Sequence, residues 1–347
     1  MMYTTMISLA LLCFLFSLHA ASAFAAGNFI STWYNATDMA RSLDELREHS
    51  AQFASVSIFA LGNSSSSAAE KLAWMSTVRH ELGIETYWLW GGDMDSFYTA
   101  EQRRKTVAWV VNRTEAAGYA GVDLDFEHLP KNSTVTDAYS AFLRQLSTAL
   151  HAGGMKLSAC VGSYPTADDG ISVFYDPAVI NETVDIVRVM NYDMYYVGGR
   201  GVPALASRPD CEGMGPTSTV PWARHSMEWW MARVHPQKLV MGLPAYSNDY
   251  SALPGRGGSN GTQQGVGPPV EEAIPGTIET VWTYFDQMFV HRYLAASTGE
   301  PRVRYGVDVK STQAQLVSAK SLGVRAVGFW TWNTASDAMR KAALSWR

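Results

Sequence analysis

Short apolar runs alternate with amphipathic helical patterns along most of the chain, and this alternation restricts the folds open to it. We count eight runs, at residues 29–34, 55–61, 85–90, 121–127, 156–164, 185–192, 238–246 and 325–332. Between them apolar residues recur at helical spacing, as Val107, Val110 and Val111 do. A strand followed by a returning helix is the unit of a parallel sheet, and eight such units close a barrel. The sequence therefore predicts an α/β protein, a (β/α)8 TIM barrel.

One connection is much longer than the others. Residues 248–310 open with a Gly-rich stretch, continue with a helix-like pattern at 278–294 and end with an extended piece near Tyr305. Loops of this length inside a compact domain usually carry function. We predict an insertion between strand 7 and its following helix, at the C-terminal face of the barrel.

The start of the chain has the features of a secretory leader. An apolar run at 7–18 precedes small residues at 20–25 that fit a signal peptidase site, although the first residues contain no Lys or Arg, which leaves an uncleaved anchor as the alternative. We therefore expect a signal peptide at 1–25 and a barrel domain at 26–347. Two cysteines then remain, Cys160 and Cys211, which could form one disulfide or stay as thiols.

Glycosylation motifs agree with this leader. Six of the ten Asn residues lie in N-x-Ser/Thr sequons: Asn35, Asn63, Asn112, Asn132, Asn181 and Asn260. The enrichment indicates a secretory route, ending in export or in a lysosome-like compartment, with no membrane association once the leader is removed.

Charge and aromatic content narrow the class of partner. The formal net charge is −5, which provides no basic patch for nucleic acid. Aromatic residues make up 12% of the chain, and their flat apolar rings suit both a protein core and the faces of sugars.

The run at 121–127 carries three acids at alternate positions, Asp123, Asp125 and Glu127. Side chains alternate along a strand, so the acids share one side and the apolar residues between them take the other. In a barrel the apolar side faces the helices, which points the acids inward, where unpaired charge is costly. Crowded acids cannot all ionise at neutral pH. Glu127, the last acid and the nearest to the C-terminal rim, is placed to hold a proton and to act as a general acid.

Two other interpretations of these acids are open. They could pair with an interior cation such as Arg188 and have only a structural role. They could instead hold a divalent cation, as in a metal-dependent barrel hydrolase, although no neighbouring His pair favours that. We expect no metal and no cofactor.

The same segment, Ala120 to Glu127, resembles the D-G-x-D-x-D-x-E signature of glycoside hydrolase family 18, with Ala120 in place of the first Asp and Phe126 where Trp is common. Further along, 190–193 resembles the family's M-x-Y-D strand, 238–246 its seventh strand, and Phe329–Trp330 its last strand. More narrowly, Asn333 and the Gly92–Asp93 turn resemble the di-N-acetylchitobiase branch.

The resemblance implies a retaining, substrate-assisted glycosidase that cleaves β-1,4 linkages beside N-acetylglucosamine in chitooligosaccharide or chitobiose-type substrates. Glu127 would protonate the leaving oxygen while the 2-acetamido carbonyl attacks the anomeric carbon. Asp125 would bind the acetamide nitrogen, Asp123 would take the spare proton, and Tyr192 would donate to the acetamide oxygen.

The sugar pocket follows from the same resemblance. Trp330 would form its floor, Asp193 would contact the sugar, and Met190 and Tyr246 would line it. The family also includes lectin-like members that bind sugar without cleaving it, and the retained Glu127 favours an enzyme over that alternative. We expect a monomer whose partner is an N-acetylglucosamine-containing glycan.

Overall fold

The computed structural model describes residues 27–35, 39–59, 67–127, 129–163, 174–195, 215–253, 274, 276–284 and 286–347. Eight parallel strands form a closed barrel in which each strand pairs with the next and the last returns to the first. They are β1 (Ile30–Asn35), β2 (Phe53–Phe59), β3 (Glu85–Trp90), β4 (Gly121–Leu124), β5 (Lys156–Gly162), β6 (Ile186–Met190), β7 (Leu239–Pro244) and β12 (Ala326–Trp330). The predicted barrel is confirmed, because each of the eight apolar runs overlaps one of these strands.

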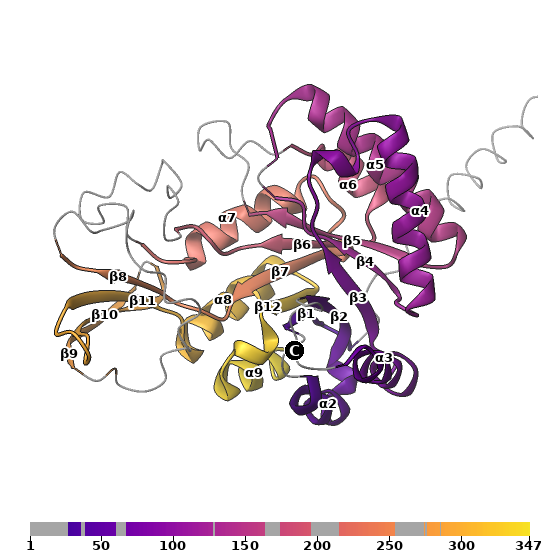
Figure 1. Cartoon of the computed structure of the whole chain (residues 1–347). Helices are drawn as coiled ribbons and strands as arrows, with labels where there is room; N and C mark the ends of the chain where they lie inside the picture. Colours follow the sequence, from indigo (N-terminus) through magenta and orange to yellow (C-terminus); the bar gives the residue numbers. More distant parts are fainter. Residues whose placement is uncertain are drawn as a thin grey trace, which may run out of the picture.

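Helices surround the barrel on its outer side (Figure 1). They are α2 (Met39–Glu48), α3 (Ala68–Ser76), α4 (Ala100–Ala116), α5 (Ser133–Ala152), α6 (Pro177–Thr183), α7 (Val220–Met231), α8 (Val309–Leu322) and α9 (Asp337–Leu344). Local sequence fixes where they begin. Thr99 and Gln102 form a capping box at α4, in which each side chain binds the other residue's backbone N–H, at 3.2 and 2.7 Å.

The strands separate two cores. On the outer side, Val122 and Leu124 of β4 and Leu146 of α5 are fully buried between sheet and helices. On the inner side, the middle of the barrel is polar, although branched apolar residues usually fill this place. Ser57 of β2, Asp123 of β4 and other polar side chains meet there. This polar layer lies directly beneath the candidate site.

The insertion is a separate antiparallel sheet between β7 and α8, which confirms its predicted position. Its strands are β8 (Asn248–Ser251), β9 (Thr277–Thr283), β10 (Met288–Leu294) and β11 (Pro301–Gly306), in the order β8-β11-β10-β9, and the sheet projects away from the barrel (Figure 1). The extended piece near Tyr305 is β11. The helix expected at 278–294 is wrong, because this stretch is the β9–β10 hairpin. Its β-branched and aromatic residues suit paired strands, as the Trp282–Phe289 cross-strand pair shows, with ring centroids 4.8 Å apart.

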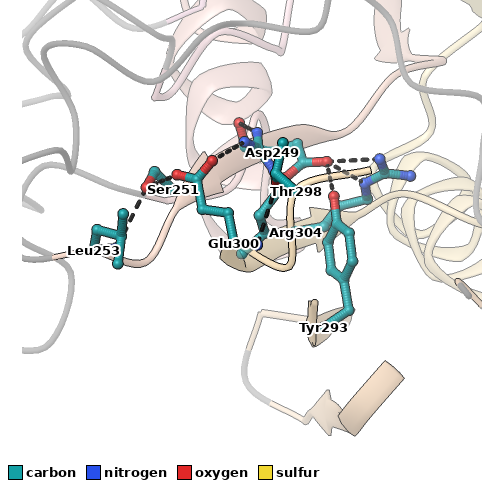
Figure 2. Close-up of polar contacts among 8 residues, drawn as sticks. Asp249, Ser251, Leu253, Tyr293, Thr298, Glu300 and Arg304 are labelled. Carbon is teal, nitrogen blue, oxygen red and sulfur yellow. Dashed lines mark hydrogen bonds and ion pairs between the residues drawn. The ribbon is translucent and has the colours of Figure 1, made fainter. Parts of the chain in front are cut away.

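Asp249 anchors this sheet (Figure 2). Its carboxylate, 3% exposed, accepts hydrogen bonds from Arg302 Nε at 2.9 Å, from Arg304 Nη2 at 2.6 Å and from the Tyr293 hydroxyl. Asp249 is in β8, whereas its partners are in β10 and β11. A buried carboxylate is tolerated only with such partners, so the cluster joins three of the four strands.

Several predictions concern residues outside the described part of the chain, namely the signal peptide at 1–25, Asn63, Asn260 and Cys211. Among the described helices, none is both long enough and apolar enough to cross a bilayer.

Candidate active site

The solvent exposure of the three acids in the 121–127 segment increases along the chain. Asp123, in β4, is fully buried, Asp125 is half-buried, and Glu127 is exposed. Regular pairing ends at Leu124, although the backbone N–H of Asp125 still donates to Trp90 O at 2.9 Å. The arrangement expected from strand alternation is therefore present, with Glu127 nearest the solvent.

A cleft of about 490 Å³ opens beside the two upper acids. Its lining residues are Gly91, Gly92, Asp93, Ser96, Asp125 and Glu127. A Cβ atom on Gly91 would lie 2.6 Å from the carbonyl oxygen of Asp125. The missing side chain therefore lets the segment after β3 lie directly against the acidic strand.

Asp123 is surrounded by donors. Its carboxylate accepts hydrogen bonds from Ser57 Oγ and Ser158 Oγ, each at 2.6 Å, and has Cys160 Sγ at 3.7 Å. Arg188 Nε lies 3.2 Å from Asp123 Oδ2, and both side chains are fully buried. The interior ion pair considered from sequence therefore exists, but it involves only the deepest acid. Cys160 is a free, buried thiol.

Asp125 is in the opposite situation. Its Oδ1 atom is buried and has no hydrogen-bond partner among the described residues. Burial, followed by the negative charges of Glu127 and Asp123, raises the pKa of Asp125 to about 7. Burial, more than crowding by the other two acids, therefore keeps a proton on Asp125 in mildly acidic solution.

An aromatic cluster, the aromatic floor, lies close to these acids, because the charges of Asp125 and Glu127 act on its members Tyr192 and Tyr246. Trp330, the last residue of β12, stacks on Phe59 with ring centroids 4.7 Å apart, and contacts Trp33 at 5.7 Å and Tyr192 at 6.2 Å. Tyr192 in turn contacts Tyr246 at 6.2 Å. Met190 packs against the same cluster. The structure thus brings together the four residues predicted to form the sugar pocket with Asp193, namely Met190, Tyr192, Tyr246 and Trp330.

The Tyr192 hydroxyl is buried and, like Asp125 Oδ1, lacks a hydrogen-bond partner in the described part of the chain. Burial raises the pKa of this hydroxyl well above its ordinary value, so it keeps its proton and remains a donor.

Asp193 follows β6 in a left-handed backbone conformation, with φ of 59°, which few non-glycine residues adopt. Two contacts hold it there. Its N–H donates to Thr217 Oγ1 at 3.2 Å, and the Tyr246 hydroxyl donates to its Oδ1. Backbone strain of this kind persists where the surroundings enforce it, which is common at functional sites.

The site also contains residues that the sequence did not assign to it. Phe59 belongs to the aromatic floor, and Asp93 and Ser96 line the cleft. Phe59 ends β2, and the two others follow β3. A position at the C-terminal end of a barrel strand was the available signal, since active sites of this fold gather there.

The metal interpretation finds no support in the donor geometry. The oxygens of Asp123 already bind two hydroxyls and a guanidinium, whose charge opposes a metal ion at the same place. Among the described residues, no group of three His, Cys, Asp or Glu side chains is arranged to hold a metal ion.

Comparison with known proteins bears on this geometry. The family model "Glycosyl hydrolases family 18" matches residues 29–344. The chain is 27% identical over 206 residues to the class V chitinase CHIT5b of Medicago truncatula, covering 56% of this chain and 48% of that protein. It is 25% identical over 228 residues to a Bacillus subtilis (strain 168) protein described as sporulation-specific glycosylase YdhD, covering 66% of this chain and 50% of YdhD. The chain thus spans half or less of the length of these two relatives.

The fold has solved counterparts. A chitinase from Chromobacterium violaceum ATCC 12472 superposes with a TM-score of 0.70 at 18% identity, covering 92% of this chain and 98% of the chitinase. A likeness at this level of identity concerns the fold, and the side chains of the cleft carry the question of activity.

Proposed function

Because the chain belongs to glycosyl hydrolases family 18, we propose that it is a secreted glycosidase that cleaves β-1,4 linkages beside N-acetylglucosamine in short chitooligosaccharide or chitobiose-type substrates. One observation carries the proposal. Asp125 Oδ1 and the Tyr192 hydroxyl are both buried near the cleft, and neither has a partner among the described residues. Buried polar atoms are rarely left unpaired in a protein, so this pair is consistent with a ligand that supplies the missing bonds.

An acetamide group has the complementary chemistry. Its N–H needs an acceptor, which Asp125 Oδ1 provides, and its carbonyl oxygen needs a donor, which the Tyr192 hydroxyl provides. Both groups are held before the substrate arrives, so they need little reorganisation as charge develops in the reaction. This pairing favours a sugar with a 2-acetamido group over a simple hexose.

The proposed reaction proceeds in two steps with retention. In the first, Glu127 donates its proton to the glycosidic oxygen, the bond from that oxygen to the anomeric carbon breaks, and the acetamide carbonyl oxygen bonds to the anomeric carbon. In the second, water attacks the anomeric carbon of the resulting oxazolinium ion and Glu127 removes a proton from the water, while the bond from that carbon to the acetamide oxygen breaks and its electrons restore the amide carbonyl. The exposed position of Glu127 at the cleft suits exchange of a proton with leaving group and water.

The aromatic floor supplies the surface on which the reacting sugar lies. Trp330 is partly exposed at the centre of the cluster, whereas its neighbour Trp33 is fully buried. A partly exposed indole ring supported by other rings offers a flat face to a sugar. We assign Asp193 to a sugar hydroxyl, with Met190 and Tyr246 at the side of the pocket.

The leader and the sequons support a secretory protein, and we expect it to act as a monomer without a cofactor. Among the sequons in the described part of the chain, Asn112 and Asn132 are exposed. Size measurement of the purified glycoprotein, before and after enzymatic removal of N-glycans, tests its monomeric state and its glycosylation.

Release of 4-methylumbelliferone from its chitobioside and chitotrioside tests the activity. Wild type should release the fluorophore equally well with and without a chelator, and Glu127→Gln should lose turnover while still binding the sugar. Turnover that a chelator abolishes would favour the metal-dependent hydrolase. Sugar binding without turnover by folded wild type would identify a lectin-like protein and contradict the proposal.

A further inference from the structure

Arg188, near the middle of β6, is a fully buried cation that the proposed reaction does not use. Its guanidinium lies between two aromatic rings, with Cζ 5.4 Å from the Trp33 ring centroid and 5.9 Å from that of Tyr87. Burial of an arginine inside a barrel is expensive unless its charge is balanced. The balancing group is Asp123, directly below the acids that border the cleft.

The hydrogen bonds of Arg188 fix the direction of those around it. A guanidinium only donates and does not lose its proton. Its Nε donates to Ser158 Oγ at 3.1 Å, and its Nη2 donates to Ser55 Oγ at 3.1 Å. Because Ser158 Oγ accepts from Arg188, its own proton is free to go to Asp123 Oδ1, which lies 2.6 Å away. Ser55 in the same way can donate to Ser31 Oγ at 2.5 Å.

The consequence falls on Asp123. Both of its oxygens face donors, namely Ser158 on Oδ1 and Ser57, Cys160 and Arg188 on Oδ2. A protonated Asp123 would have to direct its own O–H at Ser57 Oγ or Ser158 Oγ, which reverses one of these two bonds, and it would no longer balance the charge of Arg188. A carboxylate that receives this many donors also cannot rotate without leaving several of them unpaired.

We propose that Arg188 is a positioning residue that keeps Asp123 ionised and immobile, so that the mobile proton of the acidic strand stays on Asp125 and is not shared between the two aspartates. This differs from the role that the family resemblance gives Asp123, which is to receive the spare proton. The catalytic consequence rests on the proposed glycosidase function, whereas the protonation states can be measured without it.

The other titratable groups around the two aspartates do not compete for this role. Besides Glu127 they are Cys160, Tyr139 and Tyr192, and burial raises the pKa of all three, so they remain neutral. Arg188 is the one cation that the described residues place in ion-pair contact with Asp123. Arg188 therefore supplies the fixed positive charge of the polar layer.

Carbon-13 NMR of enzyme labelled at the aspartate carboxyl carbon tests the proposal, with signals assigned through Asp123→Asn and Asp125→Asn. In wild type the Asp125 signal should titrate near neutrality, and the Asp123 signal should not move with it. In Arg188→Met, both signals should titrate together, and the pH at which the pair takes up its first proton should rise by about one unit or more. Arg188→Lys keeps the charge but cannot make both serine bonds, so it should shift the two signals less than Arg188→Met does.

Activity provides a second readout. The alkaline limb of the kcat/KM profile should move to higher pH in Arg188→Met and should move less in Arg188→Lys. A folded Arg188→Met with the wild-type titration of both aspartates would overturn the proposal. If Arg188→Met does not fold, wild type decides, since an Asp123 signal that titrates together with Asp125 is enough to reject it. If wild type shows the expected titration but no turnover, the glycosidase function is rejected and the proposed role of Arg188 is retained.

Discussion

The Tyr246 hydroxyl, just beyond the end of β7, donates to Asp193 Oδ1, just beyond the end of β6. This bond joins two neighbouring strand ends at the C-terminal face of the barrel and helps to hold Asp193 in its left-handed conformation. Both residues lie at the sugar pocket, so the bond links the position of one pocket residue to the other.

Tyr246→Phe removes this hydroxyl and keeps the ring that packs on Tyr192. We expect kcat/KM to fall about tenfold, because the lost hydrogen bond to a charged group is worth roughly 1.5 kcal/mol. Steady-state kinetics on the chitobioside measures the change. Tyr284→Phe, at an 81% exposed site in the insertion, is the matched control and should retain full activity. Equal kinetics for both variants would show that Asp193 is held without Tyr246.

Asp249 should be the most sensitive polar residue of the inserted sheet. Asp249→Ala removes the counter-charge of the partly buried Arg304 and leaves the buried Arg302 with only Glu300, at 3.9 Å, so we expect a loss of about 3 to 5 kcal/mol, as when a buried pair is broken. Urea unfolding followed by circular dichroism measures the loss. Glu279→Ala breaks an exposed pair with Arg292 in the same sheet and should cost less than about 1 kcal/mol. Similar losses for the two variants would show that the cluster in Figure 2 does not stabilise the sheet.

The barrel and its acids could be predicted from sequence because both depend on short periods. Strand alternation alone places Asp123, Asp125 and Glu127 on one side of β4, and the order of strands and helices implies a parallel barrel. The hairpin at 277–294 could not be recognised in this way. Ile278, Val281 and Trp282 have helical spacing, and only pairing with β10 reveals that they belong to a strand.

Contacts that depend on barrel closure were also beyond sequence reasoning. Phe59 in β2 meets Trp330 in β12 only because β1 lies between these strands in the closed sheet. The Asp123–Arg188 pair could be considered as a possibility from composition. Its hydrogen-bond direction depends on Ser55 and Ser158, whose positions require the register of the five neighbouring strands from β2 to β6.

Asn132 offers a test of the secretory route. Its side chain caps α5 by accepting from Val135 N–H at 3.0 Å, which leaves the amide nitrogen available to carry a sugar. We expect Asn132 to be glycosylated when the full chain is expressed in eukaryotic cells, with mass spectrometry of its peptides as the measurement. Asn181 is half-buried and accepts from His235 N–H at 2.8 Å, so we expect much lower occupancy there.

A pair of variants separates the glycan on Asn132 from the helix cap. Thr134→Val destroys the sequon and keeps the cap, so it should remove the glycan and leave the free energy of unfolding of the glycan-free protein unchanged. Asn132→Ala removes both and should cost about 1 kcal/mol. An unmodified Asn132 in secreted wild type would contradict the prediction.

Asp125 should make the protein less stable as the pH rises. Burial raises the pKa of Asp125 to about 7 in the folded protein, whereas an aspartate in an unfolded chain ionises near pH 4. Between these values the folded state binds more protons than the unfolded state, so the stability from this group is complete below about pH 4 and is lost as the pH rises through about 7.

Asp125→Asn cannot ionise and removes this loss. From pH 5 to pH 8, urea unfolding should show the free energy of unfolding of Asp125→Asn gaining on the order of 1 to 3 kcal/mol relative to that of wild type. The turnover of Asp125→Asn should be reduced about 100-fold or more. Asp137→Asn, on the exposed side of α5, should show the same difference from wild type at both pH values. A difference for Asp125→Asn that does not change with pH would mean that Asp125 is ionised in the folded protein throughout, and the acetamide would then meet a charged carboxylate at Asp125.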